Sequence, residues 1–305
     1  MSTGYKAFEK GMICKDKQYK ENTTYEENGN KICQAGVMHY CKNPFDVLNY
    51  YPLIDENGNM SEFAEVESLG EVYKDKDKSA TNKLHIGAKL EFKNFVKTCI
   101  DFIVKEAKIS KRGNPAQIAN SRSSAQISSS GYSVQIGSSG KFAQIASSGC
   151  DVKIVNNGIA AQIANSGDDT QIGNSGSNVR LASSGYAAKI VSSGNYSRIA
   201  NSGDYSQIIS SGNSTKVVSS GDDAKITSKG KRSVVMAAGY NSMVKAKVGS
   251  FITLTEWELA YVEDEGDLCW IPKCIKTEYV DGKRIKEDTF YKLVNGEFVE
   301  AVEAE

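Results

Sequence analysis

The central part of the chain repeats a pattern of nine residues, from Ala116 to about Ser250. In most units the first position is small, the second polar and the third branched-aliphatic, as in Ala161-Gln162-Ile163. Alternation with a period of two predicts a short strand whose first and third side chains point inward and whose second points outward. Fifteen units follow one another without an insertion. Such a strict period is typical of a solenoid.

Turn-forming residues fill the second half of each unit. Positions five to seven often read Asn-Ser-Gly or Ser-Ser-Gly, and position seven is glycine in thirteen of the fifteen units. We expect this glycine to supply a positive φ, and the Asn or Ser side chains to bond to nearby backbone. Nine residues are too few to close a coil around a core. The pattern therefore predicts a mainly β protein with a right- or left-handed parallel β-solenoid of about 18 residues per two-sided coil, with a three-sided coil of about 27 residues as the alternative.

Apolar patterning before the repeat predicts two further elements. Residues 1–89 read as short strands separated by turn signals such as Asp55-Glu56-Asn57-Gly58-Asn59, which indicates a small α+β domain. Residues 90–109 place their apolar side chains on one broad face, which predicts an amphipathic helix. The first coil of a solenoid exposes an apolar cross-section. We therefore expect residues 90–115 to form a capping helix and a linker.

The segment after the repeat, residues 251–305, reads as a compact β domain. The runs Val280-Asp281-Gly282-Lys283 and Val294-Asn295-Gly296-Glu297 are hairpin signals, and six Trp, Tyr and Phe residues supply a core. Residues 116–250, with 13 basic and 6 acidic side chains, carry a net charge of +7, whereas residues 251–305, with 6 and 14, carry −8. Residues 1–115 carry +1, from 18 basic and 17 acidic side chains. Three charge characters indicate three structural units, and the acidic one is a candidate surface for self-association.

The outward second position supplies the candidate interaction residues. It is mostly Gln at the start of the repeat and becomes basic further along, and tyrosines stand beside several turns. The candidates are Lys153, Arg180, Lys189, Arg198, Lys216, Lys225, Tyr186, Tyr196 and Tyr205. One interpretation is a basic face for nucleic acid or an acidic protein. The alternative is a set of Gln ladders kept soluble by Lys and Arg. Odd and even units of the repeat show no difference in composition that would decide between the 18-residue coil and the 27-residue coil.

Few patterns in the chain point to a metal, a cofactor or catalysis. The aspartates of the repeat do not recur in every unit, so we expect no calcium ladder, and we expect no cofactor. Cys14, Cys33, His39 and Cys41 form a weak candidate metal set, because their spacing is not that of a zinc finger; buried thiols and a hydrogen-bonded histidine are the favoured interpretation. The chain contains only two histidines, which argues against a His-based nucleophile relay.

The expected location is the cytoplasm. The first residues are polar and lack the apolar region of a signal peptide, and no stretch approaches the roughly 18 apolar residues that span a bilayer. An odd count of seven cysteines fits free thiols in a reducing compartment better than a disulfide framework. We therefore expect no membrane partner.

The ends of the chain resemble an uncharacterised family of bacteriophage and prophage proteins. The resemblance rests on Tyr5-Lys6-Ala7-Phe8, on the run Cys33-x-x-Gly36-x-x-His39-x-Cys41, and on a Trp-containing tail with Val280-Asp281-Gly282-Lys283 and Asn295-Gly296-Glu297-Phe298-Val299. Members also carry nonapeptide arrays. The resemblance implies a phage or mobile-element origin, in the cytoplasm of a bacterial host, and brings no activity with it.

A second resemblance concerns the N-terminal segment alone. Gly36-Val37-Met38-His39-Tyr40-Cys41, followed by Asn49-Tyr50-Tyr51, resembles a strand of ADP-ribosyltransferases. This resemblance implies an enzyme, but no residue of the chain matches the catalytic Glu or Arg of that family. It remains one of four functional hypotheses.

The favoured hypothesis is a non-enzymatic binding protein of a phage or mobile element. We expect an inhibitor or decoy of a host defence or nucleic-acid-processing protein, of the anti-CRISPR or anti-restriction type, that contacts a host protein or a protein–nucleic-acid complex. Rigid solenoids suit this role because they present a preorganised face at little ordering cost. Direct nucleic-acid binding is also open. The remaining alternatives are a structural component of the virion tail and the ADP-ribosyltransferase-like enzyme.

Overall fold

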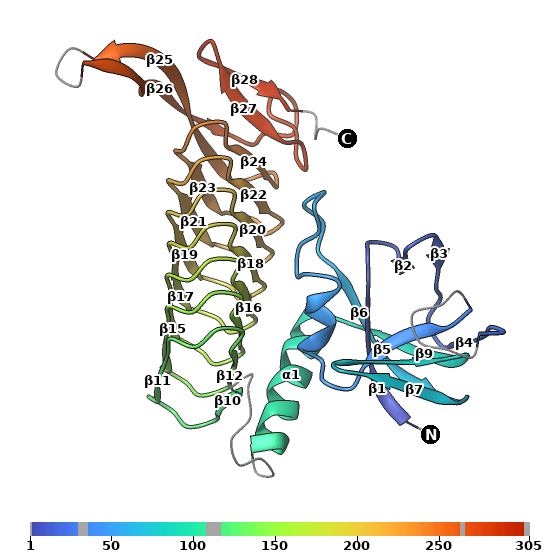
Figure 1. Cartoon of the computed structure of the whole chain (residues 1–305). Coiled ribbons are helices and arrows are strands. Elements are labelled where there is room, and N and C mark those ends of the chain that lie inside the picture. The colour runs from blue at the N-terminus through green and yellow to red at the C-terminus, as the bar shows by residue number, and fades with distance from the viewer. Residues whose placement is uncertain (1, 30–35, 108–116, 263–265, 302–305) are drawn as a thin grey trace.

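The computed structural model of the chain describes residues 2–29, 36–107, 117–262 and 266–301. Figure 1 shows a tall solenoid with a small sheet domain and a helix beside it and two hairpins at its C-terminal end. The predicted mainly β architecture is confirmed. The predicted parallel β-solenoid is also present, and it makes about eight turns of about 18 residues between residues 117 and 254. The expected linker, residues 108–115, lies outside the described residues.

Two parallel sheets form the walls of the solenoid, and consecutive strands alternate between them. We call the sheet that contacts the N-terminal domain the covered sheet and the other the open sheet. The solenoid strands of the covered sheet are β10 (Gln117–Asn120), β12 (Gln135–Ser138), β14 (Lys153–Asn156), β16 (Gln171–Asn174), β18 (Lys189–Ser192), β20 (Gln207–Ser210), β22 (Lys225–Ser228) and β24 (Met243–Ala246). Those of the open sheet are β11 (Gln126–Ser129), β13 (Gln144–Ser147), β15 (Gln162–Asn165), β17 (Arg180–Ser183), β19 (Arg198–Asn201), β21 (Lys216–Ser219), β23 (Val234–Ala237) and β25 (Phe251–Val262).

From β10 to β24, strand partners within each sheet are 18 residues apart, as in Ile136↔Ile154 and Ile145↔Ile163. This register establishes the two-sided coil and excludes the three-sided alternative. Branched-aliphatic side chains from both sheets meet in the interior, where Ile136, Ile154 and Ile172 are fully buried. Each such burial stabilises the fold by roughly 1.5–3 kcal/mol.

The glycine at position seven has a different role from the one expected. These glycines do not have positive φ; the residue at position nine does, with φ of +57° at Tyr196 and +55° at Tyr205. A Cβ added at Gly212 would overlap the carbonyl group of Gly194 in the preceding coil, with the carbonyl carbon 2.5 Å away. Position seven is therefore glycine because the turns of successive coils stack too closely for a side chain.

Asparagine at position five joins successive turns, as expected from its turn chemistry. The side-chain amide of Asn156 donates to the carbonyl of Gly158, at 3.0 Å, within its own turn. The same amide donates to Oδ1 of Asn174 in the next coil, at 2.9 Å. Both side chains are fully buried, so these bonds satisfy polar groups that would otherwise destabilise the fold.

The N-terminal domain is one antiparallel sheet with strand order β4-β9-β6-β1-β5-β8-β7. Its strands are β1 (Ser2–Phe8), β4 (Thr23–Glu26), β5 (Met38–Cys41), β6 (Glu62–Ser68), β7 (Val72–Asp75), β8 (Lys78–Thr81) and β9 (Lys83–Leu90). A small hairpin, β2 (Ile13–Cys14) and β3 (Lys17–Gln18), and a 3-10 turn, η1 (Asp46–Asn49), lie outside this sheet. The predicted turn at Asp55–Asn59 is present, because Asp55 N donates to Asn59 O at 2.8 Å.

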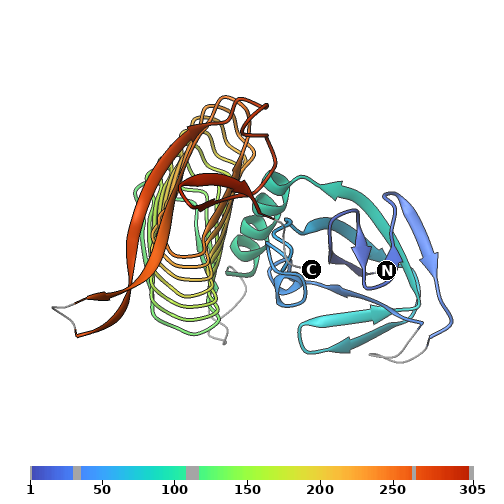
Figure 2. The ribbon, with the colours of Figure 1, turned by 90° about the horizontal axis from the view of Figure 1, so that it is seen from above.

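The predicted amphipathic helix is present as α1 (Phe92–Ala107), but it does not cap the first coil. It lies against the outer face of the covered sheet, between that sheet and the N-terminal domain (Figure 2). The Phe95 ring stacks on Phe63 of the N-terminal sheet, with centroids 3.7 Å apart. On its other side the helix lies over Gly137, where an added Cβ would be 3.4 Å from Ile103 Cδ1 and 3.5 Å from Ile100 Cα. The helix packs between the N-terminal sheet and the covered sheet because both present apolar side chains to it.

The C-terminal segment continues the solenoid and does not form a separate core. β25 continues the parallel open sheet by pairing with β23, with partners 17 residues apart, as in Val235↔Ile252, and β26 (Asp267–Tyr279) pairs with β25 as a long hairpin. The hairpin of β27 (Tyr291–Val294) and β28 (Glu297–Glu300) joins the covered sheet through β24, around the predicted Asn-Gly turn. Ile252, Ile285 and Tyr291 pack in the solenoid core. The segment therefore closes the C-terminal end of the solenoid.

We expect Gly212→Ala to lower the free energy of unfolding by about 1–3 kcal/mol, because the new methyl group forces adjacent coils apart. Gly137→Ala is the matched control, since a Cβ there would lie 3.4 Å from Ile103 Cδ1 and 3.5 Å from Ile100 Cα. Denaturant unfolding followed by circular dichroism measures both. An unchanged midpoint for Gly212→Ala would contradict the stacking argument.

Candidate functional site

The outer face of the open sheet is the most regular exposed surface of the solenoid. Its outward side chains come from the second and fourth position of each unit. The second-position row is Gln126, Gln144, Gln162, Arg180, Arg198, Lys216 and Val234. The fourth-position row is Ser128, Ala146, Ala164, Ala182, Ala200, Val218 and Met236. We call this surface the open face.

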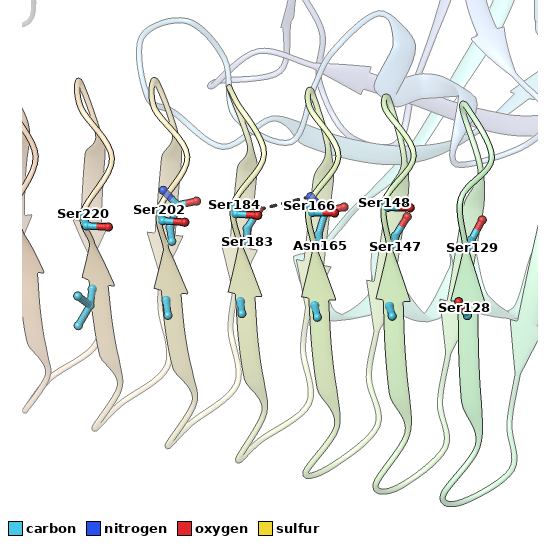
Figure 3. A pocket seen from close by; sticks show the side chains of 16 residues that line it. Ser128, Ser129, Ser147, Ser148, Asn165, Ser166, Ser183, Ser184, Ser202 and Ser220 are labelled. Carbon is cyan, nitrogen blue, oxygen red and sulfur yellow. Dashed lines mark hydrogen bonds between the residues drawn. The ribbon is translucent and has the colours of Figure 1, made fainter.

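Small side chains in the fourth-position row leave a groove along the open face. On one side of this row a hollow of about 1020 Å³ reaches the Gln, Arg and Lys side chains. On the other side a hollow of about 630 Å³ reaches the Ser and Asn side chains of the turns, which Figure 3 shows in register from coil to coil. The two hollows share the alanines and are wide open to solvent, so together they form one shallow groove whose floor is a row of methyl groups.

Three cations stand next to one another on one side of this groove. Arg180 pairs with Arg198, and Arg198 with Lys216, in the parallel ladder. Their backbones are therefore separated by about 4.8 Å per coil. All three residues are exposed, and within the described residues none of them forms an ion pair. Like charges at this spacing repel, so an anionic partner along the row would lower the electrostatic energy.

The other three basic candidates do not belong to this surface. Lys153, Lys189 and Lys225 occupy second positions of the covered sheet, where they are buried or half-buried. The Lys153 ammonium donates to Asn49 Oδ1 of the N-terminal domain. Burial lowers the pKa of Lys153 and of Lys189. The expected single basic face is therefore divided between two opposite faces, because successive units point in opposite directions.

Second-position side chains of the covered sheet hold the N-terminal domain in place. Gln135 Nε2 donates to Asp46 Oδ1 at 3.1 Å, and Gln135 Oε1 accepts from Asn43 Nδ2 at 3.0 Å. Gln171 Oε1 accepts from the Leu53 backbone N–H at 2.9 Å. Burial raises the pKa of Asp46 to about 6, although the bond from Gln135 partly opposes this rise. The polar candidates on this side are thus contacts within the chain.

The three tyrosine candidates lie on two different edges. Tyr186 and Tyr205 follow strands of the open sheet, and their ring centroids are 5.2 Å apart. Tyr196 follows β18 of the covered sheet and therefore lies in the turns of the opposite edge. All three side chains are exposed. The structure brings two of them together and separates the third.

The two edges of the solenoid carry opposite charge. The turns that follow open-sheet strands contain all six acidic residues of the repeat and no basic one: Asp151, Asp168, Asp169, Asp204, Asp222 and Asp223. We call this the acidic edge. The turns that follow covered-sheet strands contain six basic residues and no acidic one: Arg122, Lys141, Lys229, Lys231, Arg232 and Lys247. We call this the basic edge. It lies next to the second-position row of the open face, because the turns of this edge lead directly into the open-sheet strands, whose first residue is the second position of the unit.

Odd and even units do differ in composition, so the expectation that composition offers no difference to decide between the two coil sizes was wrong. The signal was present in the sequence, because every acidic residue falls in alternate units. Several of these aspartates cap the next turn: Asp168 Oδ1 accepts the Tyr186 backbone N–H at 2.8 Å, and Asp222 Oδ1 accepts that of Tyr240 at 2.7 Å. At these positions the aspartate side chains stabilise the stacking of successive turns.

The candidate metal set is only partly placed by the structure. Cys33 lies outside the described residues. Cys14 Sγ accepts from the Tyr51 hydroxyl at 3.0 Å and from Lys6 Nζ at 3.4 Å. Burial raises the pKa of the Cys41 thiol to about 12, so it stays protonated at neutral pH. Across the described residues no group of three or more His, Cys, Asp or Glu side chains is arranged to hold a metal ion.

The segment that resembles ADP-ribosyltransferases lines a cavity of the N-terminal domain. Residues 36–41, with Tyr50 and Tyr51, contribute to its wall. The sequence singled out this segment, but no local pattern indicated that Lys6 and Tyr40 would line the same space. The enzymatic hypothesis stays a prediction.

We expect stability to decrease as pH rises from about 4 to about 6, because the folded state holds the Asp46 proton more tightly than the unfolded state, where the pKa is near 3.8. Asp46→Asn should remove this part of the pH dependence and be the more stable protein above pH 6. The exposed Asp101→Asn is the control. The measurement is the midpoint of denaturant unfolding at several pH values. If the midpoints of Asp46→Asn and of the unaltered protein change with pH in parallel, the raised pKa of Asp46 is refuted as the cause.

Comparison with known proteins reaches the N-terminal domain alone. A family model described as a domain of unknown function, DUF7666, matches residues 2–98, which contain the N-terminal sheet and the beginning of α1. No curated protein and no solved structure matches the chain. Across the described residues, the structure contains no helix with the length and apolar character that crossing a bilayer requires. The N-terminal residues are therefore similar to a domain family without an assigned activity, and that match does not extend to the solenoid.

Proposed function

We propose that the chain is a non-enzymatic binding protein of a phage or mobile element that engages a host protein through the open face. The observation that carries this proposal is the asymmetry of the two walls. The N-terminal domain and α1 pack on the covered sheet, whereas the open face keeps a groove and three adjacent cations exposed. Its place of action would be the cytoplasm of a bacterial host, and its effect would be to block or sequester a defence or nucleic-acid-processing protein.

The shape and charge of the groove favour an extended acidic segment of a protein as the occupant. Its alanine floor runs along several coils, which matches a strand-like segment of about seven residues at 3.3 Å per residue. Arg180, Arg198 and Lys216 line one side, and the basic edge adds Lys231 and Arg232 nearby in the chain. Arginine is enriched among the residues that dominate binding energy. The ladder hydrogen bonds hold the surface in shape, so little ordering entropy is lost on binding.

Nucleic acid fits this surface less well than protein. Affinity for a duplex comes largely from the phosphates that basic side chains neutralise, and it falls as salt rises, so a row of three cations would give weak, salt-sensitive binding. Binding to single strands uses aromatic platforms beside a basic groove. Here Tyr186 and Tyr205 lie on the acidic edge, beside Asp204 and Asp223. That charge repels a phosphate backbone.

Site-specific photo-crosslinking in the bacterial host tests the proposal. A crosslinker at Ala182, in the groove, should capture one defined host protein, and Arg180→Glu with Arg198→Glu should abolish capture. The matched control is Lys20→Glu with Lys74→Glu, which reverses two exposed charges on the N-terminal domain. Capture that is equal in both double variants, or capture of nucleic acid alone, would refute the proposal. Inhibition of the captured protein's activity by purified chain should be lost in the same double variant.

We also propose that the C-terminal hairpin joins two copies of the chain. Leu259 lies opposite Trp270, and Tyr261 opposite Leu268, so four exposed apolar side chains share one face of the β25–β26 hairpin. A two-stranded ribbon is only marginally stable in water. The same face on a second copy would bury both patches about a two-fold axis.

Sedimentation velocity measures this self-association. The unaltered chain should form a dimer at micromolar concentration, and Leu259→Ser with Leu268→Ser should be monomeric. Val299→Ser, at another exposed apolar position on the neighbouring hairpin, should leave the dimer intact. A monomeric unaltered chain across this concentration range would rule out the hairpin as a dimer contact.

A further inference from the structure

The N-terminal domain contains a cavity of about 700 Å³. Its wall comes from β1, from the β2–β3 hairpin, from β5 with the residues just before it, and from the η1 region. This volume falls within the range of small-molecule sites, which is roughly 300–1,000 Å³. The cavity belongs to the same stretch of chain that matches the family model, and nothing in the binding role of the open face uses it.

A buried lysine is the most unusual group in this wall. Lys6 is only 5% exposed, yet within the described residues it forms no ion pair with a carboxylate. Its Nζ donates to the His39 carbonyl at 3.0 Å and to Cys14 Sγ at 3.4 Å. The rings of Phe8 and Tyr19 lie 5.5 Å and 5.3 Å from it. Burying an ammonium group without an opposite charge is costly, so such groups are usually paired.

Two more polar groups in the wall have no hydrogen-bond partner among the described residues. They are the hydroxyl of Tyr40, a side chain that is 2% exposed, and Nε2 of His39. Tyr40 and Lys6 are on neighbouring strands, because β1 pairs with β5 at Tyr5↔Cys41. An unpaired buried donor destabilises a fold by about 1–3 kcal/mol. Both atoms are closed off from solvent, so they show that this wall is poor in hydrogen-bond partners, and Lys6 is the charged group that a ligand would meet.

Positive charge converges on the same space. Lys15, Lys17 and Lys78 line the cavity with Lys6, against Asp16 and Glu27. Of these, Lys17 is already paired with Glu27, and Lys78 lies over the Tyr50 ring, 5.3 Å from its centroid. Burial, and after it the charges of Lys78, Lys6 and Lys15, lower the pKa of His39. Lys78, Lys6 and Lys15 thus act electrostatically on one residue of the wall, His39.

We propose that this cavity binds a small phosphorylated molecule of nucleotide size, with Lys6 as the buried charge partner of its phosphate group. Lysine ammonium groups are point charges that suit a compact phosphate, and Lys15 and Lys78 of the same wall add donors. A cavity of about 700 Å³ is larger than a phosphate ion needs. Tyr50 and Tyr51, which are not fully buried, line the remaining space and offer ring surfaces to a planar base.

Isothermal titration calorimetry on the full chain tests this site with three probes: inorganic phosphate, AMP and adenosine. AMP should bind with saturation, phosphate more weakly, and adenosine not measurably. Lys6→Met should weaken AMP binding by at least about tenfold, because it removes the buried charge and keeps the side-chain volume. A circular dichroism spectrum establishes that this variant folds.

A second variant keeps the test decisive if Lys6→Met does not fold. Lys78→Ala changes a half-buried side chain of the same wall and should also weaken AMP binding, whereas Lys74→Ala, an exposed lysine of the neighbouring strand, should leave it unchanged. Absence of saturable AMP binding at millimolar concentration would overturn the proposal, as would equal binding of adenosine and AMP. Equal affinity of Lys78→Ala and the unaltered chain would place the ligand elsewhere. The open face takes no part in this experiment, so none of these outcomes bears on the proposal that the open face binds a host protein.

Discussion

The in-register stacking of coils, each 18 residues from the next, is the constraint on which the rest of the molecule depends. Backbone ladders hold equivalent residues about one strand spacing apart in both sheets, and the turns stack as closely as the strands do. At that distance the carbonyl of Gly194 occupies the space where a side chain of Gly212 would be. The aliphatic columns, the asparagine bonds between turns and the aspartate caps all repeat because the register repeats.

The same constraint turns single residues into rows. Residues that hold the same position in successive coils lie side by side. Basic residues at the second position of three successive open-sheet strands therefore become the adjacent Arg180, Arg198 and Lys216. Alternation between sheets then separates odd from even units. Six aspartates gather on one edge and six basic residues on the other, which gives the rod a charge difference across its width. The separation of acidic and basic side chains between the two edges is therefore complete, whereas the change from Gln to basic residues along the solenoid is gradual.

The N-terminal domain and the solenoid are joined by a helix that is apolar on both sides. Phe95 stacks on Phe63 in one direction, and Ile100 and Ile103 lie over Gly137 in the other. Around this apolar contact, Gln135 and Lys153 bond to the η1 region. One wall of the solenoid is thereby taken up by contacts within the chain. The open face and the N-terminal cavity are left as two separate places where a partner or ligand would bind.

The sequence by itself determined the solenoid, its two-unit coil as the favoured alternative, the amphipathic helix and the Asn-Gly hairpins. Each of these rests on local chemistry: a period of nine, a helical apolar face, or a turn residue with positive φ at Asn295. Only the tertiary structure decided that Lys153 is buried while Arg198 is exposed, although both hold the second position of a unit. It also decided that α1 covers a side of the solenoid and that Lys6 and Tyr40 share a cavity. These outcomes depend on contacts between residues far apart in the chain, and no local pattern carries that information.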